Sequence, residues 1–217
     1  MKVINLSENN SILNHYLKEI RSVEIQGDSM RFRRNMERIG EIMAYEISKS
    51  MNFVSEEVET PLGFAPINTI DEKIVISTIL RAGLPFHQGF LSYFDRAENA
   101  FVSAYRKYKN EVKFDIHIEY IASPDLTNKT LIITDPMLAT GSSMELAHVA
   151  LLTKGQPVNV HIATVIASKQ AVNYLKKNYA GSNVTLWAAA IDPKLNEHSY
   201  IIPGLGDAGD LAFGEKL

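Results

Sequence analysis

Hydrophobic and polar residues follow two different periods along the chain, and each change of period marks a predicted element. Over residues 29–50 the apolar positions recur every three to four residues, with Met36, Ile39 and Met43 on one face. This period is typical of an amphipathic helix, and its methionine-rich face suits core packing better than ligand binding. A shorter helix is expected over residues 9–20. We expect these two helices to cover a sheet edge or to form a subunit interface.

Short apolar runs bounded by turn residues come next, and they predict buried strands. The predicted strands cover residues 73–79, 100–105, 130–134, 158–167 and 184–191. The predicted helices between them cover residues 84–94, 144–152 and 168–177. Strands that alternate with helices in this way indicate an α/β protein with a doubly wound, mainly parallel sheet. Residues 54–67 are expected to form an extended or hairpin stretch, and residues 107–123 a hairpin or a mobile excursion from the sheet.

The most informative stretch is Leu131–Met144, which reads LIITDPMLATGSSM. A short apolar run ends at Asp135, and a loop of small residues leads into the next helical pattern. Ser142 and Glu145 have the spacing of a capping box. In an open α/β sheet this order places an acid and free backbone N–H groups where ligands bind, and a phosphate suits such a site. An ordinary strand–helix turn has the same spacing, and a mononucleotide P-loop fits poorly because no lysine follows the glycine.

Two arginines are expected near this loop. Arg81 follows the strand predicted over residues 73–79, and Arg106 follows the strand over residues 100–105. A guanidinium offers fixed bidentate donors to phosphate, so two strand-end arginines suit a polyphosphate. A surface arginine at a turn is the alternative for Arg81. The basic run Arg31–Arg34 indicates a solvated helix face.

The C-terminal part contains Gly204–Gly209, which formally matches the dinucleotide fingerprint GxGxxG. We reject that interpretation, because the fingerprint opens a βαβ unit and few residues follow. Tyr200–Pro203 and Phe213 flank the stretch and would anchor it. An ordered glycine-rich loop brings backbone N–H and C=O groups close to a small flat ligand, whereas the alternative is a fraying tail.

Composition narrows the class of protein. The chain has 217 residues, of which 46% are hydrophobic and 22% charged, with a net charge of −3 and no cysteine. These values favour a globular chain without disulfides or thiolate metal sites, and they give no reason to expect nucleic acid as a partner. The first residues turn polar at once and no run is long enough for a membrane span, so we expect a soluble cytoplasmic protein.

Four motifs together resemble the uracil phosphoribosyltransferases, a type I phosphoribosyltransferase family. They are Leu80–Leu84, Tyr105–Arg106, Asp135–Ser143 and Leu195–Gly214, and they occur in the family's order. The resemblance implies one domain over residues 1–217, with an N-terminal helical arm over about 1–52, a core over about 70–192 and a small C-terminal base-binding hood over about 193–217. It implies transfer of the phosphoribosyl group of phosphoribosyl diphosphate (PRPP) to uracil, giving UMP and diphosphate in pyrimidine salvage. It also implies Mg2+ as cofactor and a homodimer or higher homo-oligomer.

The resemblance also assigns the site residues. Arg81 and Arg106 would bind the diphosphate of PRPP, and Asp135 would hold the ribose hydroxyls. Asp207 would reach PRPP or the water around its metal, and these four residues are the expected catalytic set. The full PRPP set is Arg81, Arg106, Asp135, Pro136, Met137, Leu138, Ala139, Thr140, Gly141, Ser142, Ser143 and Asp207. The uracil set is Ile201, Gly206, Asp207 and Ala208. No side chain is expected to bind Mg2+ directly, because PRPP and water would hold it.

Three stretches depart from the family's pattern. Ser142 stands where the family usually has a second glycine, which we expect to be tolerated if its φ stays negative. Residues 107–123 lack the usual threonine and proline, and Ala167–Ala171 replaces the usual small-Pro-Glu-Gly turn. These departures motivate an alternative function, a catalytically weak regulator on the same fold that senses PRPP or nucleotides and binds RNA. GTP activation stays open. No histidine falls in a matched motif, so we interpret all of them as structural or surface residues.

Overall fold

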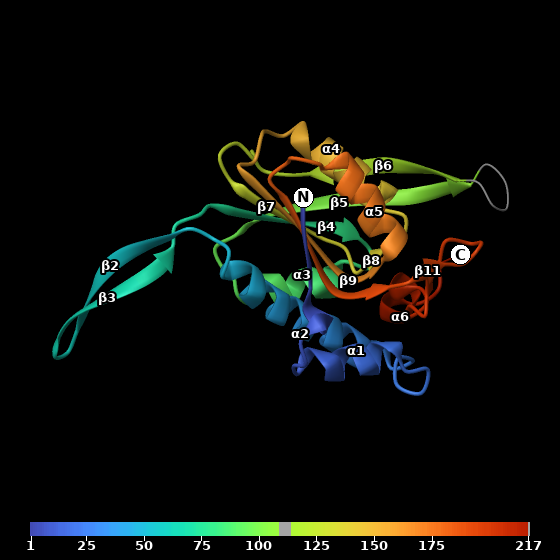
Figure 1. Cartoon of the computed structure of the whole chain (residues 1–217), viewed down its shortest axis with the longest axis horizontal. Helices are drawn as coiled ribbons and strands as arrows, with labels where there is room; N and C mark the ends of the chain where they lie inside the picture. Colours follow the sequence, from blue (N-terminus) through green and yellow to red (C-terminus); the bar gives the residue numbers. More distant parts are fainter. Residues whose placement is uncertain (109–113, 217) are drawn as a thin grey trace.

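The computed structural model describes residues 1–108 and 114–216, and the side chains of residues 104–118 lie outside the described part. Its centre is an eight-stranded sheet (Figure 1). The strands are β1 (Lys2–Asn5), β4 (Ile74–Leu80), β5 (Glu98–Tyr108), β6 (Phe114–Ala122), β7 (Thr130–Thr134), β8 (Met137–Leu138), β9 (Asn159–Ser168) and β10 (Val184–Asp192). Their order is β1-β10-β9-β7-β4-β5-β6, with β8 beside β9. These strand pairs are parallel except for the β5–β6 hairpin.

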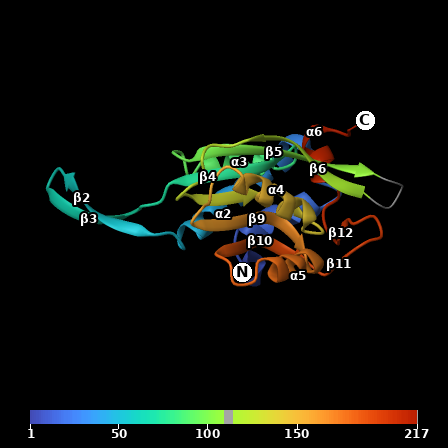
Figure 2. The same cartoon turned by 90° about the horizontal axis from the view of Figure 1, so that it is seen from above.

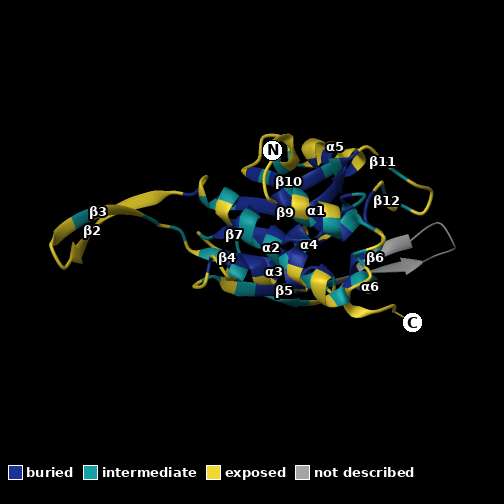
Figure 3. Ribbon diagram, turned by 90° about the horizontal axis from the view of Figure 1, so that it is seen from below, coloured by how far each residue is buried: buried dark blue, intermediate teal, exposed yellow. Residues whose placement is uncertain are grey.

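Helices cover both faces of this sheet. One face carries α1 (Leu13–Arg21), α2 (Ser29–Ser48) and α3 (Leu84–Leu91), and the other carries α4 (Ser142–Leu152) and α5 (Lys169–Asn178). Each face of the sheet has its own hydrophobic core, and strand β7 contributes side chains to both. Ile132 packs with the first helical layer, whereas Leu131 and Ile133 pack with the second, since successive side chains point to opposite faces. The doubly wound α/β prediction is confirmed, and Figure 3 shows the strands of the sheet largely buried between the layers.

The N-terminal helices lie on a face of the sheet rather than at its edge. The apolar stripe of α2 is buried as predicted, with Met36, Ile39 and Met43 at 1% exposure or less. The edge beside β10 is taken by β1, which the sequence analysis missed. A strand of four residues is too short to show an alternating pattern. Its pairing with β10 joins the two ends of the chain, so no local sequence signal reveals it.

A two-stranded hairpin leaves the body of the molecule between α2 and β4. It consists of β2 (Phe53–Thr60) and β3 (Gly63–Ile70), which pair in antiparallel fashion as the sequence suggested. In Figures 1 and 2 it extends well away from the sheet, and Figure 3 shows it almost wholly exposed. Strands β5 and β6 confirm the hairpin alternative for residues 107–123, and both strands belong to the main sheet; residues 109–113 lie outside the described residues.

The C-terminal segment folds beside the carboxyl ends of the parallel strands. It contains β11 (Lys194–Leu195), β12 (Ile201–Ile202) and α6 (Ala208–Phe213), and a short 3-10 helix η1 (Leu6–Glu8) follows β1 at the other end of the chain. The short helix α6 was not predicted, because its six residues are too few to show a helical period. No helix in the described part of the chain is long and apolar enough to cross a bilayer.

Three histidines are buried in the body of the protein, at exposures of 3%, 6% and 7%. Burial lowers the pKa of His87, His148 and His161 below the usual value. Their side-chain hydrogen-bond partners are Asn99, Tyr179 and Trp187, respectively. All three are therefore neutral parts of the core at physiological pH.

We predict that the free energy of unfolding falls as the pH drops below about 6.5, the pKa of an unfolded histidine. The folded pKa values lie below this value, so the unfolded chain binds more protons and acid favours unfolding. Each histidine contributes a slope of up to about 1.4 kcal/mol per pH unit. Urea unfolding between about pH 7.5 and 5.5 measures this slope. The slope should be smaller in His161→Gln than in the wild type; equal slopes would contradict the prediction.

Candidate active site

The carboxyl ends of β4 and β7 meet at one edge of the sheet because the two strands are parallel neighbours. Thr78 of β4 pairs with Thr134 of β7, so Arg81 and Asp135 follow adjacent strand ends. The loop after β4 turns back onto β7 at Gly83. A Cβ atom there would lie 2.1 Å from Thr78 Oγ1 and 3.3 Å from the Thr134 carbonyl oxygen. Only glycine fits this approach, which holds the Arg81 loop against the strand that leads to Asp135.

Arg81 contacts the C-terminal segment. Its Nη2 lies 3.2 Å from Asp210 Oδ1 and donates to the Gly214 carbonyl oxygen at 3.4 Å. The Arg81 side chain is 44% exposed, so this ion pair is a weak one that another anion can replace. The structure thus brings the Arg81 motif and the glycine-rich C-terminal motif together.

For Arg106, the second predicted arginine, the structure describes only the backbone. Arg106 continues β5 beyond Ser103, the residue that pairs with Leu80 at the end of β4. Its backbone therefore lies toward the same edge of the sheet as the loop that carries Arg81. The side chain of Arg106 lies outside the described residues.

The predicted phosphate loop starts at Asp135 and ends at α4. Asp135 is half-buried, and its Oδ1 accepts a hydrogen bond from the Met137 N–H at 3.4 Å. Between Asp135 and the small-residue loop, β8 pairs with β9, and this pairing orders Met137 and Leu138. Pro136 and Leu138 are buried, so they support the loop from behind.

The predicted capping box is wrong. The N-cap of α4 is Gly141, with φ of 89°, and Ser142 is already the first helical residue. The Ser142 hydroxyl instead forms a hydrogen bond of 2.8 Å with the Thr140 hydroxyl. The left-handed conformation of Gly141 needs a residue without Cβ, whereas Ser142 stays at negative φ, which explains why serine is tolerated there.

The predicted uracil-binding residues of the C-terminal segment lie in β12 (Ile201) and at the N-terminus of α6 (Gly206, Asp207 and Ala208). Ile201 and Ala208 are buried at 4% and 3% exposure, whereas Gly206 is exposed. Asp207 caps α6, since its Oδ1 accepts from the backbone N–H groups of Gly209 at 2.8 Å and Asp210 at 3.1 Å.

Electrostatics keep Asp207 ionised. Burial raises the pKa of this carboxyl. The backbone N–H of Asp210 and the Lys216 ammonium 3.2 Å away lower it by more, so the pKa lies below its usual value. The segment therefore offers a fixed carboxylate beside Arg81, whose Nη2 lies 3.8 Å from a Cβ built on Gly209.

Sequence reasoning missed the contact that holds this segment in place. Arg21, at the end of α1, donates to both oxygens of Asp192 at 2.9 Å and to the Gly204 carbonyl oxygen at 3.1 Å. The Gly204 N–H donates to Asp192 Oδ2 at 2.9 Å. Asp192 is 5% exposed, so the pair is largely removed from water. No local signal reveals it, because Arg21 and Asp192 are 171 positions apart.

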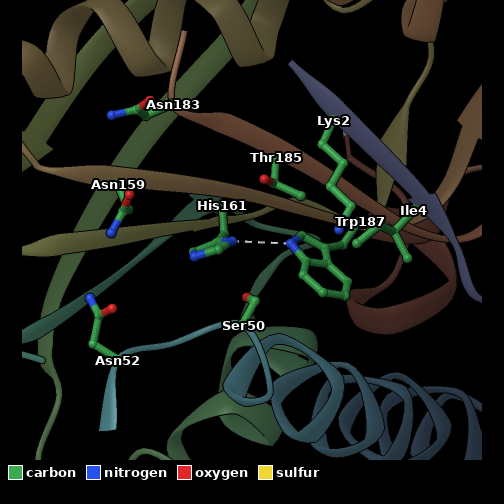
Figure 4. A pocket seen from close by; sticks show the side chains of 9 residues that line it. All are labelled: Lys2, Ile4, Ser50, Asn52, Asn159, His161, Asn183, Thr185 and Trp187. Carbon is green, nitrogen blue, oxygen red and sulfur yellow. Dashed lines mark hydrogen bonds between the residues drawn. The ribbon is translucent and has the colours of Figure 1, made fainter. Parts of the chain in front are cut away.

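A hollow of about 300 Å³ lies at the opposite edge of the sheet, near the amino ends of β1, β9 and β10. Figure 4 shows Lys2, Asn159 and His161 around it, with His161 accepting a hydrogen bond from the Trp187 indole. The predicted phosphate and base motifs are all at the carboxyl edge, so this hollow is not part of the candidate active site.

Comparisons with known proteins decide the family. A family model described as uracil phosphoribosyltransferase matches residues 7–215. A uracil phosphoribosyltransferase of Porphyromonas gingivalis is 64% identical over 217 residues, which is the full length of both chains. The chain belongs to the uracil phosphoribosyltransferase family. A member from Methanothermobacter thermautotrophicus is 39% identical over 189 residues, covering 86% of this chain and 85% of its own.

Solved structures agree with the fold. The AQ2163 protein from Aquifex aeolicus superposes with a TM-score of 0.86 and 31% identity, covering 98% of both chains. A hypoxanthine phosphoribosyltransferase from Staphylococcus aureus has a TM-score of 0.51 at 13% identity, covering 86% of this chain and 83% of its own, and shows a shared fold. None of these comparisons favours the alternative of an RNA-binding regulator. The basic run on α2 also has local partners, since Arg31 pairs with Glu19 and Arg34 with Glu37.

For this family member we predict that Arg21→Met lowers the free energy of unfolding by about 2–4 kcal/mol, because it leaves Asp192 buried without its cation. It should also raise KM for uracil more than KM for PRPP, since the Gly204 carbonyl loses its donor. Urea unfolding and steady-state kinetics measure the two effects.

The matched control is Arg31→Met, which removes an exposed ion pair with Glu19. Such a pair contributes under about 1 kcal/mol, so this variant should retain both stability and KM. The prediction fails if the two variants behave alike.

Proposed function

We propose that this member of the uracil phosphoribosyltransferase family forms UMP at the carboxyl edge of its sheet. The observation that carries the proposal is the meeting of three motifs. The Arg81 loop rests on the end of β7 through Gly83, and it contacts the C-terminal segment through Asp210. A ligand bound at Asp135 would therefore touch all three.

Each part of PRPP has a complementary group at this edge. Arg81 and Arg106 would bind the diphosphate, as charge-assisted bidentate donors do. Asp135 would accept hydrogen bonds from the ribose hydroxyls. The 5′-phosphate would lie on the backbone of Ala139–Ser143, at the N-terminus of α4, where free N–H groups and the helix dipole favour an anion.

The C-terminal segment would read the edge of uracil. Uracil presents alternating carbonyl and N–H groups, and a fixed backbone can match that pattern. We assign this role to the backbone of Ile201 and to Gly206, Asp207 and Ala208. Cytosine would leave buried polar groups unpaired, which gives selectivity without a bulky pocket.

The chemistry follows from these placements. A ring nitrogen of uracil forms the bond to C1 of the ribose as the bond from C1 to the diphosphate oxygen breaks, and the uracil N–H proton is released. The transition state carries positive charge on the ribose and negative charge on the leaving diphosphate. Preformed cationic donors such as Arg81 stabilise that negative charge, and orientation of the two substrates lowers the barrier further, so no protein nucleophile is needed.

Magnesium fits this donor set. Asp135 and Asp207 would accept hydrogen bonds from the ribose hydroxyls or from water around the ion, and Mg2+ in phosphate sites usually keeps several waters and takes few protein ligands. When bound through PRPP, it would neutralise the leaving diphosphate. The side chains of this chain would meanwhile hold and orient the substrates.

The test is a direct assay of purified protein with PRPP, Mg2+ and uracil, following UMP, with cytosine and hypoxanthine in parallel. We predict UMP from uracil, little product from the other bases, and loss of activity when a chelator removes Mg2+. Arg81→Ala should lower kcat/KM by about 10²-fold or more. Arg96→Ala should not, because the exposed Arg96 precedes β5, whereas the proposed site follows the strand ends. Absence of UMP from the wild-type protein would refute the function.

We further propose that the chain is a single cytoplasmic domain that assembles as a homodimer or larger homo-oligomer through the β2–β3 hairpin. Three apolar residues on one face of the hairpin, Val54, Val58 and Ile67, are 40–47% exposed. An isolated two-stranded hairpin with an apolar face is marginal in water, so a second copy is the expected cover.

Ile67→Glu should therefore dissociate the assembly, because it replaces an apolar side chain between Val54 and Val58 by a second carboxylate opposite Glu56. Asn68→Glu is the matched control, since Asn68 is exposed on the opposite face of the same strand. Sedimentation velocity of the wild type and both variants measures the mass. A monomeric wild type, or equal masses for the two variants, would contradict this proposal.

A further inference from the structure

The hydroxyl of Ser168 joins the predicted phosphate loop to the start of α5. Ser168 is fully buried, at 0% exposure, and it is the N-cap of α5. Its Oγ accepts a hydrogen bond from the Ala171 N–H at 2.9 Å and donates one to the Ala139 carbonyl oxygen at 2.5 Å. A hydroxyl has one proton and two lone pairs, so it can make both bonds at once.

The bond to Ala139 fixes the orientation of a peptide group in the loop. The Ala139–Thr140 peptide is trans, and in a planar trans peptide the N–H points opposite to the C=O. Ser168 draws the Ala139 carbonyl toward α5, and the Thr140 N–H therefore points away from α5. Among the described residues, this N–H has no backbone acceptor in a turn, loop or cap. A free loop N–H before a helix N-terminus is the kind of donor that binds phosphate.

Helix α5 also supports the rest of the loop. A Cβ built on Gly141 would lie 2.9 Å from Tyr174 Cδ1 and 3.4 Å from Leu175 Cγ, so the loop backbone rests on these side chains. The Tyr174 hydroxyl donates to Glu145, in the first turn of α4, and Asn178 donates to the same carboxylate at 2.9 Å. Helix α5 thus supports the loop by packing, and the Ser168 side chain adds a hydrogen bond to the Ala139 carbonyl oxygen.

We propose that Ser168 is a positioning residue for the phosphate subsite, which turns the Ala139–Thr140 peptide so that its N–H faces the 5′-phosphate of PRPP. This inference rests on the proposed function. It also assigns a role to the Ala167–Ala171 turn, in which this sequence departs from the family's pattern. The residue acts through the loop backbone and does not itself touch substrate.

The primary test is Ser168→Ala in the UMP assay. The change removes the donor to Ala139, so the Thr140 N–H loses its fixed direction. We expect KM for PRPP to rise about fivefold or more, the equivalent of one net hydrogen bond, while kcat and KM for uracil change less. Ser168→Thr keeps the hydroxyl and should restore KM for PRPP.

Two inhibitors separate the phosphate subsite from the diphosphate subsite. Ribose 5-phosphate carries only the 5′-phosphate, and inorganic diphosphate carries only the leaving group. In Ser168→Ala, the inhibition constant of ribose 5-phosphate should rise by the same factor as KM for PRPP. The inhibition constant of diphosphate should stay unchanged, because Arg81 and Arg106 are untouched.

A matched control removes a helix N-cap elsewhere. Asp28 caps α2 by accepting from the Arg31 N–H at 3.0 Å, so Asp28→Ala should lower thermal stability without raising KM for PRPP. If Ser168→Ala does not fold, Ser168→Cys keeps a weak donor of similar size and should show a smaller rise.

The outcomes separate the two claims. No UMP from the wild type would refute the proposed function itself. An active wild type with unchanged KM for PRPP in the Ser168 variant, or with equal changes for both inhibitors, would overturn the role of Ser168.

Discussion

The parallel pairing of β4 with β7 is the constraint on which the rest of the site depends. Parallel neighbours end at the same edge, so the loops after both strands face one volume. Gly83 then lets the Arg81 loop fold back on the end of β4, where a Cβ would lie 2.1 Å from Thr78 Oγ1 and 3.3 Å from the Thr134 carbonyl oxygen of β7. A slip of one residue would turn Ile132 toward the wrong core and move Asp135 away from Arg81, so the two packed faces of the sheet also fix the site.

The C-terminal segment is attached to this edge by the N-terminal helices. Arg21 of α1 holds Asp192 and Gly204, and Arg33 of α2 donates to the Ala212 carbonyl oxygen at 2.6 Å. Residues that contact no substrate in the proposed arrangement therefore set the position of the base-binding turn. The phosphate loop has an equivalent support in α5. Both proposed substrate subsites are thus backbone surfaces whose geometry is fixed from behind by side chains of α1, α2 and α5.

Sequence patterns predicted what is local and periodic. The alternating strands and helices and the acid at the end of β7 follow from short-range signals. The four motifs indicated the family by their resemblance to the uracil phosphoribosyltransferases, and the comparisons confirm that family. Partners far apart in the sequence were missed, as with Arg21 and Asp192, because no local pattern links them. The capping box at Ser142 was wrong for a different reason, since its spacing does not reveal the left-handed turn at Gly141. The roles of Arg106 and the uracil-binding residues stay predictions.

A crystal structure of the protein with UMP would test the central claim most directly, since the product carries both the base and the 5′-phosphate. We expect the phosphate on the backbone N–H groups of residues 139–143, the ribose hydroxyls at Asp135, and the uracil edge against Ile201 and residues 206–208. A phosphate bound elsewhere, or a base that does not touch the C-terminal segment, would contradict the account.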